Sequence, residues 1–178
     1  VDDGKNVFVV CACYVISATG IFENTRTLSV EAGAEKIKYN YNCSTKNKHL
    51  VLVGGANSAV DFITYLLPNN KISWVIRSEH WVPPFSVVEE NFKIVMCDYS
   101  KNLNLYRSSQ VSQIESRKVH LTDGKIIDNV DSVTAMLGYN SLGDLYKDSS
   151  VEFDGECLKL NDFFETSLKN MFAFGSVM

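Results

Sequence analysis

Several features of membrane, metal-binding and nucleic-acid-binding proteins are missing from this sequence of 178 residues. No segment approaches the roughly 18 consecutive apolar residues that a membrane-spanning helix needs. Lysine and arginine are scattered and the net charge is -4, whereas nucleic-acid binding needs a concentrated basic face. The composition therefore predicts a globular protein with no membrane and no nucleic-acid partner.

The cysteines also lack a pattern, because the five of them include no C-x2-C or Cys/His pairs of the kind that bind zinc. We expect no metal and interpret the cysteines as reduced thiols. Cys11 and Cys13 lie in an apolar run, where burial makes a thiol unreactive, so a structural role is preferred over a redox role. The start of the chain lacks a secretory signal and an initiator methionine. We therefore expect a cytoplasmic protein, of which this chain is a piece.

In the middle of the chain, the spacing of apolar residues changes from that of a strand to that of a helix and back again. Leu50–Val53 is a short continuous apolar run, as in a buried strand of a parallel sheet, and glycines 54–55 follow it. From Ala56 to Leu67 apolar residues recur at helical spacing until a proline stops them. Ile72–Ile76 is a second β-rich run. This order predicts a βαβ unit with two parallel strands.

Weaker signals surround this unit. Asn6–Thr19 is an apolar run that predicts a buried strand or a pair of short strands, and Glu23–Lys48 is polar with little periodicity, as in a linker. After Arg77, Trp81 and prolines 83–84 predict a loop.

Three further elements are predicted toward the C-terminus. Phe92–Met96 is interpreted as a third strand. Gln110–Leu137 contains an Asp-Gly turn between alternating stretches, which predicts an antiparallel hairpin. Asn170–Gly175 predicts a final strand that joins a sheet.

The turn between the first strand of the βαβ unit and its helix follows the dinucleotide-binding pattern G-x-G-x-x-G/A. Gly54 stands where the pattern needs a tight turn, and Ala59 is small enough for close packing of helix and strand. Ala56 departs from the pattern, because its methyl group stands where a phosphate should approach. The helix N-terminus would still attract the anion through its free N–H groups. The predicted cofactor-binding residues here are Gly54, Gly55, Ala56, Asn57, Ser58 and Ala59.

The residue at the end of the second strand discriminates between nicotinamide cofactors. An acidic residue there binds the ribose 2′-hydroxyl, whereas a basic one pairs with a 2′-phosphate. Arg77 occupies this place, which favours NADP over NAD, the alternative being a solvated surface arginine. His80 follows three residues later and either assists with the phosphate or simply lies in the loop.

These residues resemble a known family. Val51–Ala59 and Trp74–Arg77 look like the NADPH domain of thioredoxin-reductase-like flavoproteins, within the pyridine nucleotide-disulfide oxidoreductase family. Ile16–Gly20 resembles the turn where the chain leaves the FAD domain, and Thr166–Gly175 resembles the strand by which it returns. The resemblance adds further cofactor-binding residues, namely Thr19, Gly20, Gly138, Gly175 and Ser176.

The resemblance implies an α/β fold. Residues 31–138 would form a Rossmann-like NAD(P)H-binding domain with a parallel sheet, helices and a β-meander. Residues 1–30 and 139–178 would be pieces of an FAD-binding domain, whose first glycine motif would lie upstream of residue 1. A chain without that motif should hold FAD poorly. Ser176 stands where the family usually has an aspartate that binds the flavin, which is a further reason to expect weak FAD binding.

The resemblance also implies a function. In the full-length protein NADPH would pass hydride to FAD, and the flavin would reduce a disulfide-type acceptor. No side chain of this chain would be catalytic. A homodimer is a possible assembly. Ile37–Asn40 replaces the C-x-x-C of thioredoxin reductases, which excludes dithiol exchange here. The stretch Lys38–Tyr41 instead resembles the bacillithiol-disulfide-reductase-like branch. The isolated chain should bind nucleotide without turnover.

Two alternative functions stay open at this point. A flavin-containing monooxygenase shares both dinucleotide motifs but delivers electrons to oxygen. A degenerate nucleotide-fold domain would bind no nucleotide and serve as an interaction module, which is suggested by Ala56 and Ser176.

Overall fold

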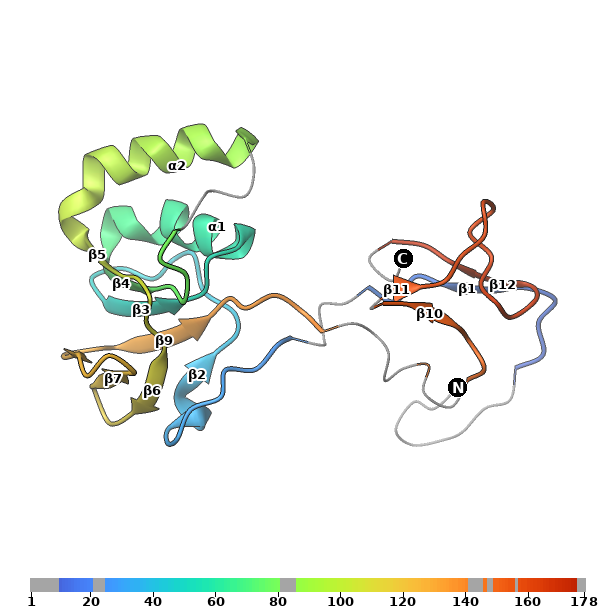
Figure 1. The fold of residues 1–178 in the computed structure, drawn as a ribbon. Coiled ribbons are helices and arrows are strands. Elements are labelled where there is room, and N and C mark those ends of the chain that lie inside the picture. The colour runs from blue at the N-terminus through green and yellow to red at the C-terminus, as the bar shows by residue number, and fades with distance from the viewer. Residues whose placement is uncertain are drawn as a thin grey trace. The chain divides into compact units, whose positions relative to one another are not determined.

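The structure is a computed structural model that describes residues 10–20, 25–80, 86–140, 146, 149–155 and 157–175, with the backbone alone at 86–89. The chain divides into two compact units, each described here by itself (Figure 1). The larger unit is Arg26–Gly138, and the smaller one combines Val1–Thr25 with Tyr139–Met178. Most of the predicted proline-containing loop, at residues 81–85, lies outside the described residues.

A five-stranded parallel sheet organises the larger unit. Its strand order is β2-β9-β3-β4-β5, and every neighbouring pair runs parallel. The strands are β2 (Ile37–Lys38), β3 (His49–Val53), β4 (Lys71–Val75), β5 (Leu103–Tyr106) and β9 (Ser132–Ala135). The central strand β3 is buried from Leu50 to Val53, as a parallel strand covered on both faces should be. The predicted α/β fold with a parallel sheet is confirmed.

Two helices cover one face of this sheet (Figure 1). They are α1 (Asn57–Leu66) and α2 (Ser86–Tyr99), with 3-10 turns η1 (Ala34–Lys36), η2 (Leu67–Asn69) and η3 (Ser100–Asn102). The buried side of α1 includes Phe62, Ile63 and Leu66, which pack with Leu52 and Trp74 of the sheet. The predicted βαβ unit is therefore confirmed, and its helix ends where Pro68 enters η2.

A β-meander covers the other face. It consists of β6 (Val111–Ile114), β7 (Val119–Leu121) and β8 (Ile126–Ile127), paired antiparallel. Val119, Ile114 and Val130 pack with Val51 and Val133 of the parallel sheet in a second core cluster. The predicted hairpin is confirmed, and the backbone N–H of Leu121 donates to the carbonyl of Lys125 across the Asp-Gly turn, at 2.9 Å.

One predicted strand is wrong. Residues 92–96 lie inside helix α2. Phe92, Val95, Met96 and Tyr99 recur at spacings of three and four residues and pack against the core that contains α1, whereas Ile94 between them is exposed. The five apolar-rich letters were too short a window to show that period. The third strand of the βαβαβ order is β5, which the sequence analysis did not predict.

The predicted linker is also partly wrong. Within Glu23–Lys48, Ile37 belongs to β2 and is buried, and Leu28, Val30 and Tyr39 pack against the core under the meander. An edge strand of two residues has too little alternation to be recognised in the sequence. The described part of this segment is therefore part of the larger unit from Arg26 onward.

The described residues of the smaller unit form two short strand pairs and one small apolar cluster. Strand β1 (Val15–Ser17) pairs parallel with β12 (Met171–Ala173), and β10 (Phe153–Asp154) pairs antiparallel with β11 (Cys157–Leu158). Its buried apolar cluster consists of Tyr146, Val151, Leu158 and Ala173. The Ser17 hydroxyl is hydrogen bonded to the phenol of Tyr146. The predicted final strand is confirmed.

The prediction of a buried strand over Asn6–Thr19 is wrong for the described residues. Val10 and Ile16 are 68% and 67% exposed, because β1 has three residues and its one strand neighbour is β12. Cys11 and Cys13 are exposed as well, so burial does not make these thiols unreactive in this structure. No helix in the described ranges is long and apolar enough to cross a membrane.

Candidate functional site

A cleft of about 520 Å³ opens at the carboxyl ends of the parallel strands. The turns after β3, β4 and β9 contribute Val53–Ala56, Val75–Ser78 and Met136–Leu137, and further lining comes from Arg26–Ser29 and Ser109–Gln110. In open parallel sheets, ligands bind outside this edge, where consecutive turns diverge. The cleft therefore lies where a sheet of this type holds a ligand.

Gly54 makes the tight turn that leads from β3 to helix α1. Its φ is +126°, and a Cβ atom added to it would lie 2.2 Å from the carbonyl oxygen of Met136. The indole Nε1 of Trp74 donates to the Gly54 carbonyl at 2.6 Å, which fixes the turn from the helix side of the sheet. Only glycine fits this position, because both the backbone conformation and the space exclude a side chain.

Ala56 is the N-cap of α1 and is exposed at the cleft. Its backbone is extended, with φ -91° and ψ -174°, so no glycine conformation is required there. The Ala56 side chain makes no capping hydrogen bond, and the N–H of Ala59 already donates to the Ala56 carbonyl at 2.9 Å. The N–H groups of Asn57 and Ser58 are therefore the ones that the first turn offers to an anion, with the favourable end of the helix dipole behind them. The arrangement fits a phosphate, with the Ala56 methyl group as the one addition to the usual pattern.

Arg77 and Ser78 follow β4 on the other side of the cleft. Arg77 is exposed and lines the cleft, and within the described part of the chain no hydrogen bond or ion pair occupies its guanidinium. His80 is exposed but does not line the cleft; its backbone carbonyl accepts a hydrogen bond from the Ser78 hydroxyl at 2.8 Å. Arg77 is therefore the cation available to a ligand at this side.

The structure thus brings together four of the predicted residues, namely Gly54, Gly55, Ala56 and Arg77. Asn57 and Ser58 continue into the first turn of α1, and Ala59 is fully buried beneath it, as a small packing residue should be. Gly138 has a φ of +80° and its carbonyl accepts the backbone N–H of Arg26 at 3.0 Å, one residue beyond the cleft lining.

The remaining predicted residues belong to the smaller unit. Thr19 and Gly20 follow β1, and Gly175 follows β12 with a φ of +79°. Because β1 and β12 pair in parallel, these turns leave the same end of the pair. Ser176 lies outside the described residues.

The sequence analysis missed part of the cleft lining. Arg26–Ser29 lines the cleft although it was interpreted as part of a linker, and Tyr39 holds it through a hydrogen bond that its phenol oxygen accepts from the backbone N–H of Leu28, at 3.0 Å. No sequence signal marks this segment. Met136–Leu137 could have been found, because it directly follows a strand of the same parallel sheet.

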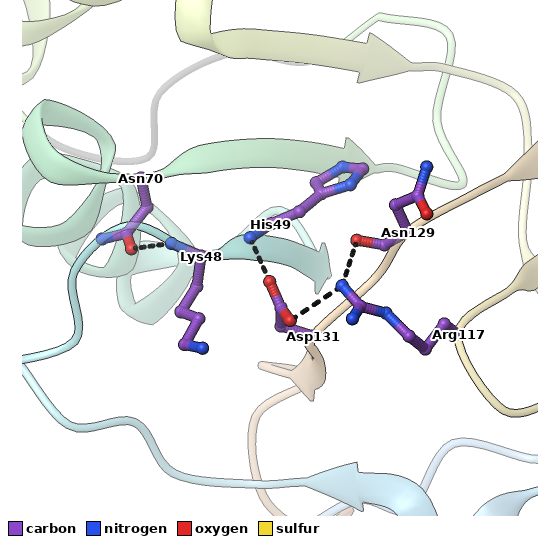
Figure 2. A network of polar contacts seen from close by, with 6 residues as sticks. All are labelled: Lys48, His49, Asn70, Arg117, Asn129 and Asp131. Atoms are coloured by element: carbon purple, nitrogen blue, oxygen red, sulfur yellow. Dashed lines mark hydrogen bonds and ion pairs between the residues drawn. The ribbon is translucent and has the colours of Figure 1, made fainter.

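The amino ends of the strands are built differently, with a polar network that joins chain segments (Figure 2). Asp131 accepts the backbone N–H of His49 at 2.9 Å through one oxygen and Arg117 at 3.0 Å through the other. Asn70 accepts the backbone N–H of Lys48 at 3.1 Å. These bonds lie between protein groups and fix the strand ends.

The pKa values of two network groups follow from these contacts. The pKa of Asp131 is lowered, first by the hydrogen bond from His49 and then by the charge of Arg117. The pKa of His49 is lowered by burial and by the charge of Lys71. In the described ranges, no three His, Cys, Asp or Glu side chains gather in a way that could hold a metal ion.

Comparisons with known proteins identify a family and a fold. A family model described as pyridine nucleotide-disulphide oxidoreductase matches residues 5–175. In sequence, no curated protein matches the chain.

Solved structures with the same fold include two bacillithiol disulfide reductases. The one from Bacillus cereus is 22% identical with a TM-score of 0.79 and aligns with 92% of this chain and 53% of its own. The one from Staphylococcus aureus is 23% identical with a TM-score of 0.79, over 92% and 54%. Thioredoxin reductase from Lactococcus lactis is 18% identical with a TM-score of 0.73, over 92% and 57%. The chain spans about half the length of these proteins.

Proposed function

Because the chain belongs to the pyridine nucleotide-disulphide oxidoreductase family, we propose that Arg26–Gly138 binds NADP(H) in the cleft at the carboxyl ends of the parallel strands. The observation that carries the proposal is the meeting of Gly54, the uncapped N-terminus of α1 and Arg77 around one cleft. When bound, the nicotinamide supplies a hydride for a flavin in the whole protein. The residues of this chain bind and orient the nucleotide.

The pyrophosphate is assigned to the turn 54–59. Gly54 lets the chain reverse sharply between β3 and α1, and we expect the free N–H groups at the start of α1, together with the helix dipole, to stabilise the negative charge of the pyrophosphate. Gly55 and Ala56 line the cleft beside them. The methyl group of Ala56 narrows the approach, and we expect it to lower the affinity without abolishing binding.

The 2′-phosphate of NADP is assigned to Arg77, with the Ser78 hydroxyl beside it. A guanidinium gives a phosphate two parallel charge-assisted hydrogen bonds, and Arg77 occupies the end of the second strand, where the ribose lies in this type of fold. His80 stays a candidate from the loop, although it does not line the cleft.

The smaller unit is proposed to be part of an FAD-binding domain in the whole protein. Thr19, Gly20, Gly175 and Ser176 are its candidate flavin contacts, and Gly138 belongs to the connection between the units. We propose that electrons leave the flavin for a disulfide-type acceptor, by analogy with the reductases of the same fold. All five cysteines are free, so no dithiol pair of this chain is assigned to that step. A homodimer and a cytoplasmic location stay predictions from the sequence.

The experiment is calorimetric titration of the chain with NADP⁺ and NAD⁺, for the wild type and for Arg77→Ala. We expect NADP⁺ to bind more tightly than NAD⁺. Arg77→Ala should weaken NADP⁺ about tenfold, as the loss of charge-assisted hydrogen bonds does, and should leave NAD⁺ within about twofold. Arg107→Ala is the matched control, because Arg107 is another exposed arginine of this unit that does not line the cleft.

Two results would contradict the proposal at different levels. Absence of heat and of any thermal shift at millimolar NADP⁺ and NAD⁺ would reject nucleotide binding and favour an interaction module. Equal weakening of both cofactors by Arg77→Ala would reject the 2′-phosphate assignment alone. Ala56→Gly gives an independent check, because removal of the methyl group should tighten both cofactors if the pyrophosphate lies on this turn.

A further inference from the structure

A second cavity, of about 400 Å³, lies in the larger unit at the opposite ends of the strands. It opens on the helix side of the sheet, between the second half of α1 and the beginnings of β3 and β9, and it shares no lining residue with the cleft. Leu50, Phe62 and Leu66 form its apolar base. Its size is within the range of small-molecule sites, which are apolar cavities with a few placed polar groups.

Tyr41 makes an aromatic wall of this cavity. Its ring contacts that of Phe62 edge to face, with centroids 5.1 Å apart, which is a stable arrangement for two aromatic rings. Burial, with smaller effects of nearby Cys43 and Asp61, raises the pKa of Tyr41 to about 12. The phenol is therefore protonated at neutral pH and is a hydrogen-bond donor, yet it has no partner within the described ranges.

A second hydroxyl is also left without a partner. Thr134 on β9 is 3% exposed and lines the cavity, and in the described part of the chain no hydrogen bond engages its side chain. The Thr134 oxygen is not one of the sealed side-chain atoms that lack a partner, so it is open to the cavity. Tyr41 and Thr134 thus supply two hydroxyl donors on the walls of one cavity.

The charge at the rim is positive. Lys38 and Lys48 line the cavity and are exposed, and neither ammonium group is in an ion pair within the described residues. The one carboxylate of the lining, Asp131, already pairs with Arg117 and accepts the backbone N–H of His49 (Figure 2). The charge of Arg117 acts on Asp131 more strongly than that of Lys48, so the lining keeps a net positive charge for a ligand, with Lys38 and Lys48 as its two cations.

We propose that this cavity binds a small organic carboxylate with an apolar body, such as an arylalkanoate. The apolar body lies against Leu50, Phe62 and the ring of Tyr41, and the carboxylate lies between Lys38 and Lys48, where the hydroxyls of Tyr41 and Thr134 can donate to it. Proteins commonly bind phosphate with an arginine or a helix N-terminus, and the described lining of this cavity has neither. The lining therefore favours a carboxylate over a phosphate.

The test uses 3-phenylpropionate as the probe and the full chain labelled with ¹⁵N. We expect saturable shifts of the amide resonances of Lys38, Tyr41, Ser132 and Thr134 at millimolar probe. 3-Phenylpropionamide, which keeps the body and loses the charge, and propionate, which keeps the charge and loses the ring, should each bind at least threefold more weakly. Saturating NADP⁺ should leave the affinity for 3-phenylpropionate unchanged, because the two cavities share no residue.

Variants identify the groups. Replacing both rim lysines, Lys38→Gln with Lys48→Gln, should weaken 3-phenylpropionate roughly tenfold, as two exposed charge pairs together can do. Thr134→Val keeps the shape and removes one donor, and should weaken it roughly threefold. Lys101→Gln is the matched control, since Lys101 is exposed, lines neither cavity and should change nothing.

Several results would overturn this assignment. One is the absence of binding at 20 mM 3-phenylpropionate, a concentration taken as roughly the upper limit for a specific site. The others are equally tight binding of the amide, unchanged affinity in the double lysine variant, and resonance shifts centred on the nucleotide cleft. A thermal melt of each variant checks its fold. The result is independent of nucleotide binding, which calorimetry with NADP⁺ reports separately.

Discussion

The two ends of the parallel sheet differ in how their backbone groups are satisfied. At the carboxyl ends, the turn 54–56 lines an open cleft and leads into the first turn of α1, whose N-cap residue Ala56 makes no side-chain capping bond. At the amino ends, side chains bind the backbone directly, as Asp131 does with His49 and Asn70 does with Lys48 (Figure 2). Backbone groups at the carboxyl ends are therefore left for a ligand, whereas those at the amino ends are bound by side chains that hold the strands in register, and the ligand groups proposed there are side chains.

The position of the cleft residues at the carboxyl ends depends on the register of the strands, which is fixed at their amino ends. A parallel strand that slipped by one residue would turn its buried side chains to the other face. The amino-end network fixes β3 relative to β4 and β9, and so determines where Gly54 and Met136 meet at the far end. Disrupting either end should thus reduce stability, but through different physical causes.

The largest expected effect is at the carboxyl end, for Gly54→Ala. The substitution places a Cβ atom 2.2 Å from the Met136 carbonyl oxygen at a φ of +126°, so we expect a loss of about 3 kcal/mol in the free energy of unfolding. Gly124→Ala is the control, because its φ is +82° with nothing within 4 Å of the added atom, and it should cost only about 1 kcal/mol. Urea unfolding followed by circular dichroism measures both. Equal losses in the two variants would show that the cost of Gly54→Ala comes from backbone strain at positive φ and not from the contact with Met136.

The sequence predicted the centre of the larger unit well. Leu50–Val53, the helix after Ala56 and the Asp-Gly hairpin each carry a complete local signal of period, turn residue and stop, and all three are confirmed. The family was predicted from the same motifs and is confirmed by the match to residues 5–175. Local signals were sufficient where period, turn residue and stop occurred together.

The errors have two causes. Residues 92–96 were assigned to a strand because five residues are too short a window for the helical period of α2. Tertiary contacts decide the others, since β2 has only two residues and its edge position follows from pairing with β9. Arg26–Ser29 reaches the cleft through long-range packing and the Tyr39 bond. The cleft lining was therefore predicted on the side of the glycine turn and Arg77 and missed on the opposite wall, and its role in cofactor binding stays a prediction.

The amino end can be disrupted with a smaller effect by Asn70→Ala. The Asn70 side chain is 4% exposed, donates to the carbonyls of Leu66 at 2.7 Å and Thr45 at 2.9 Å, and accepts from Lys48. Removing it leaves these backbone groups unpaired, and we expect a loss of about 2 kcal/mol in unfolding free energy.

Asn102→Ala is the control for this prediction. Asn102 is another asparagine near the end of a helix, and its side chain has a single long contact of 3.5 Å to the carbonyl of Leu67. Its replacement should cost less than about 0.5 kcal/mol. If both variants lost the same stability in urea unfolding, the amino-end network would not be what fixes β4.

A smaller effect is expected for Asp131→Asn, and it should depend on pH. The folded pKa of Asp131 is lowered by the His49 hydrogen bond and by Arg117, so its contribution is present above the unfolded pKa near 4 and is lost as the pH falls through the lower folded value. The group is exposed, which limits the difference from wild type at pH 7 to below about 1 kcal/mol. Urea unfolding at pH 7, 5 and 3 should show the two proteins converging at the lowest pH. A difference that persists unchanged at pH 3 would contradict the ionic origin.

The smallest effect concerns His49, at the start of β3. Burial, and then the charge of Lys71, lower its folded pKa, while its ring is hydrogen bonded to the Ser73 hydroxyl at 2.9 Å. As the pH falls, His49 therefore takes up a proton in the unfolded chain before it does so in the folded one. The contribution of neutral His49 to the free energy of unfolding is complete above the unfolded pKa near 6.5, and it is lost as the pH falls from there toward the folded pKa. Between pH 7.5 and 5.5 the wild type should lose up to about 0.5 kcal/mol more unfolding free energy than His49→Gln, a value reduced because the ring is partly solvated. The other two histidines are present in both proteins, so their effects on the pH dependence cancel in the comparison. Parallel pH profiles of the two proteins would mean that the pKa of His49 is the same in the folded and unfolded states.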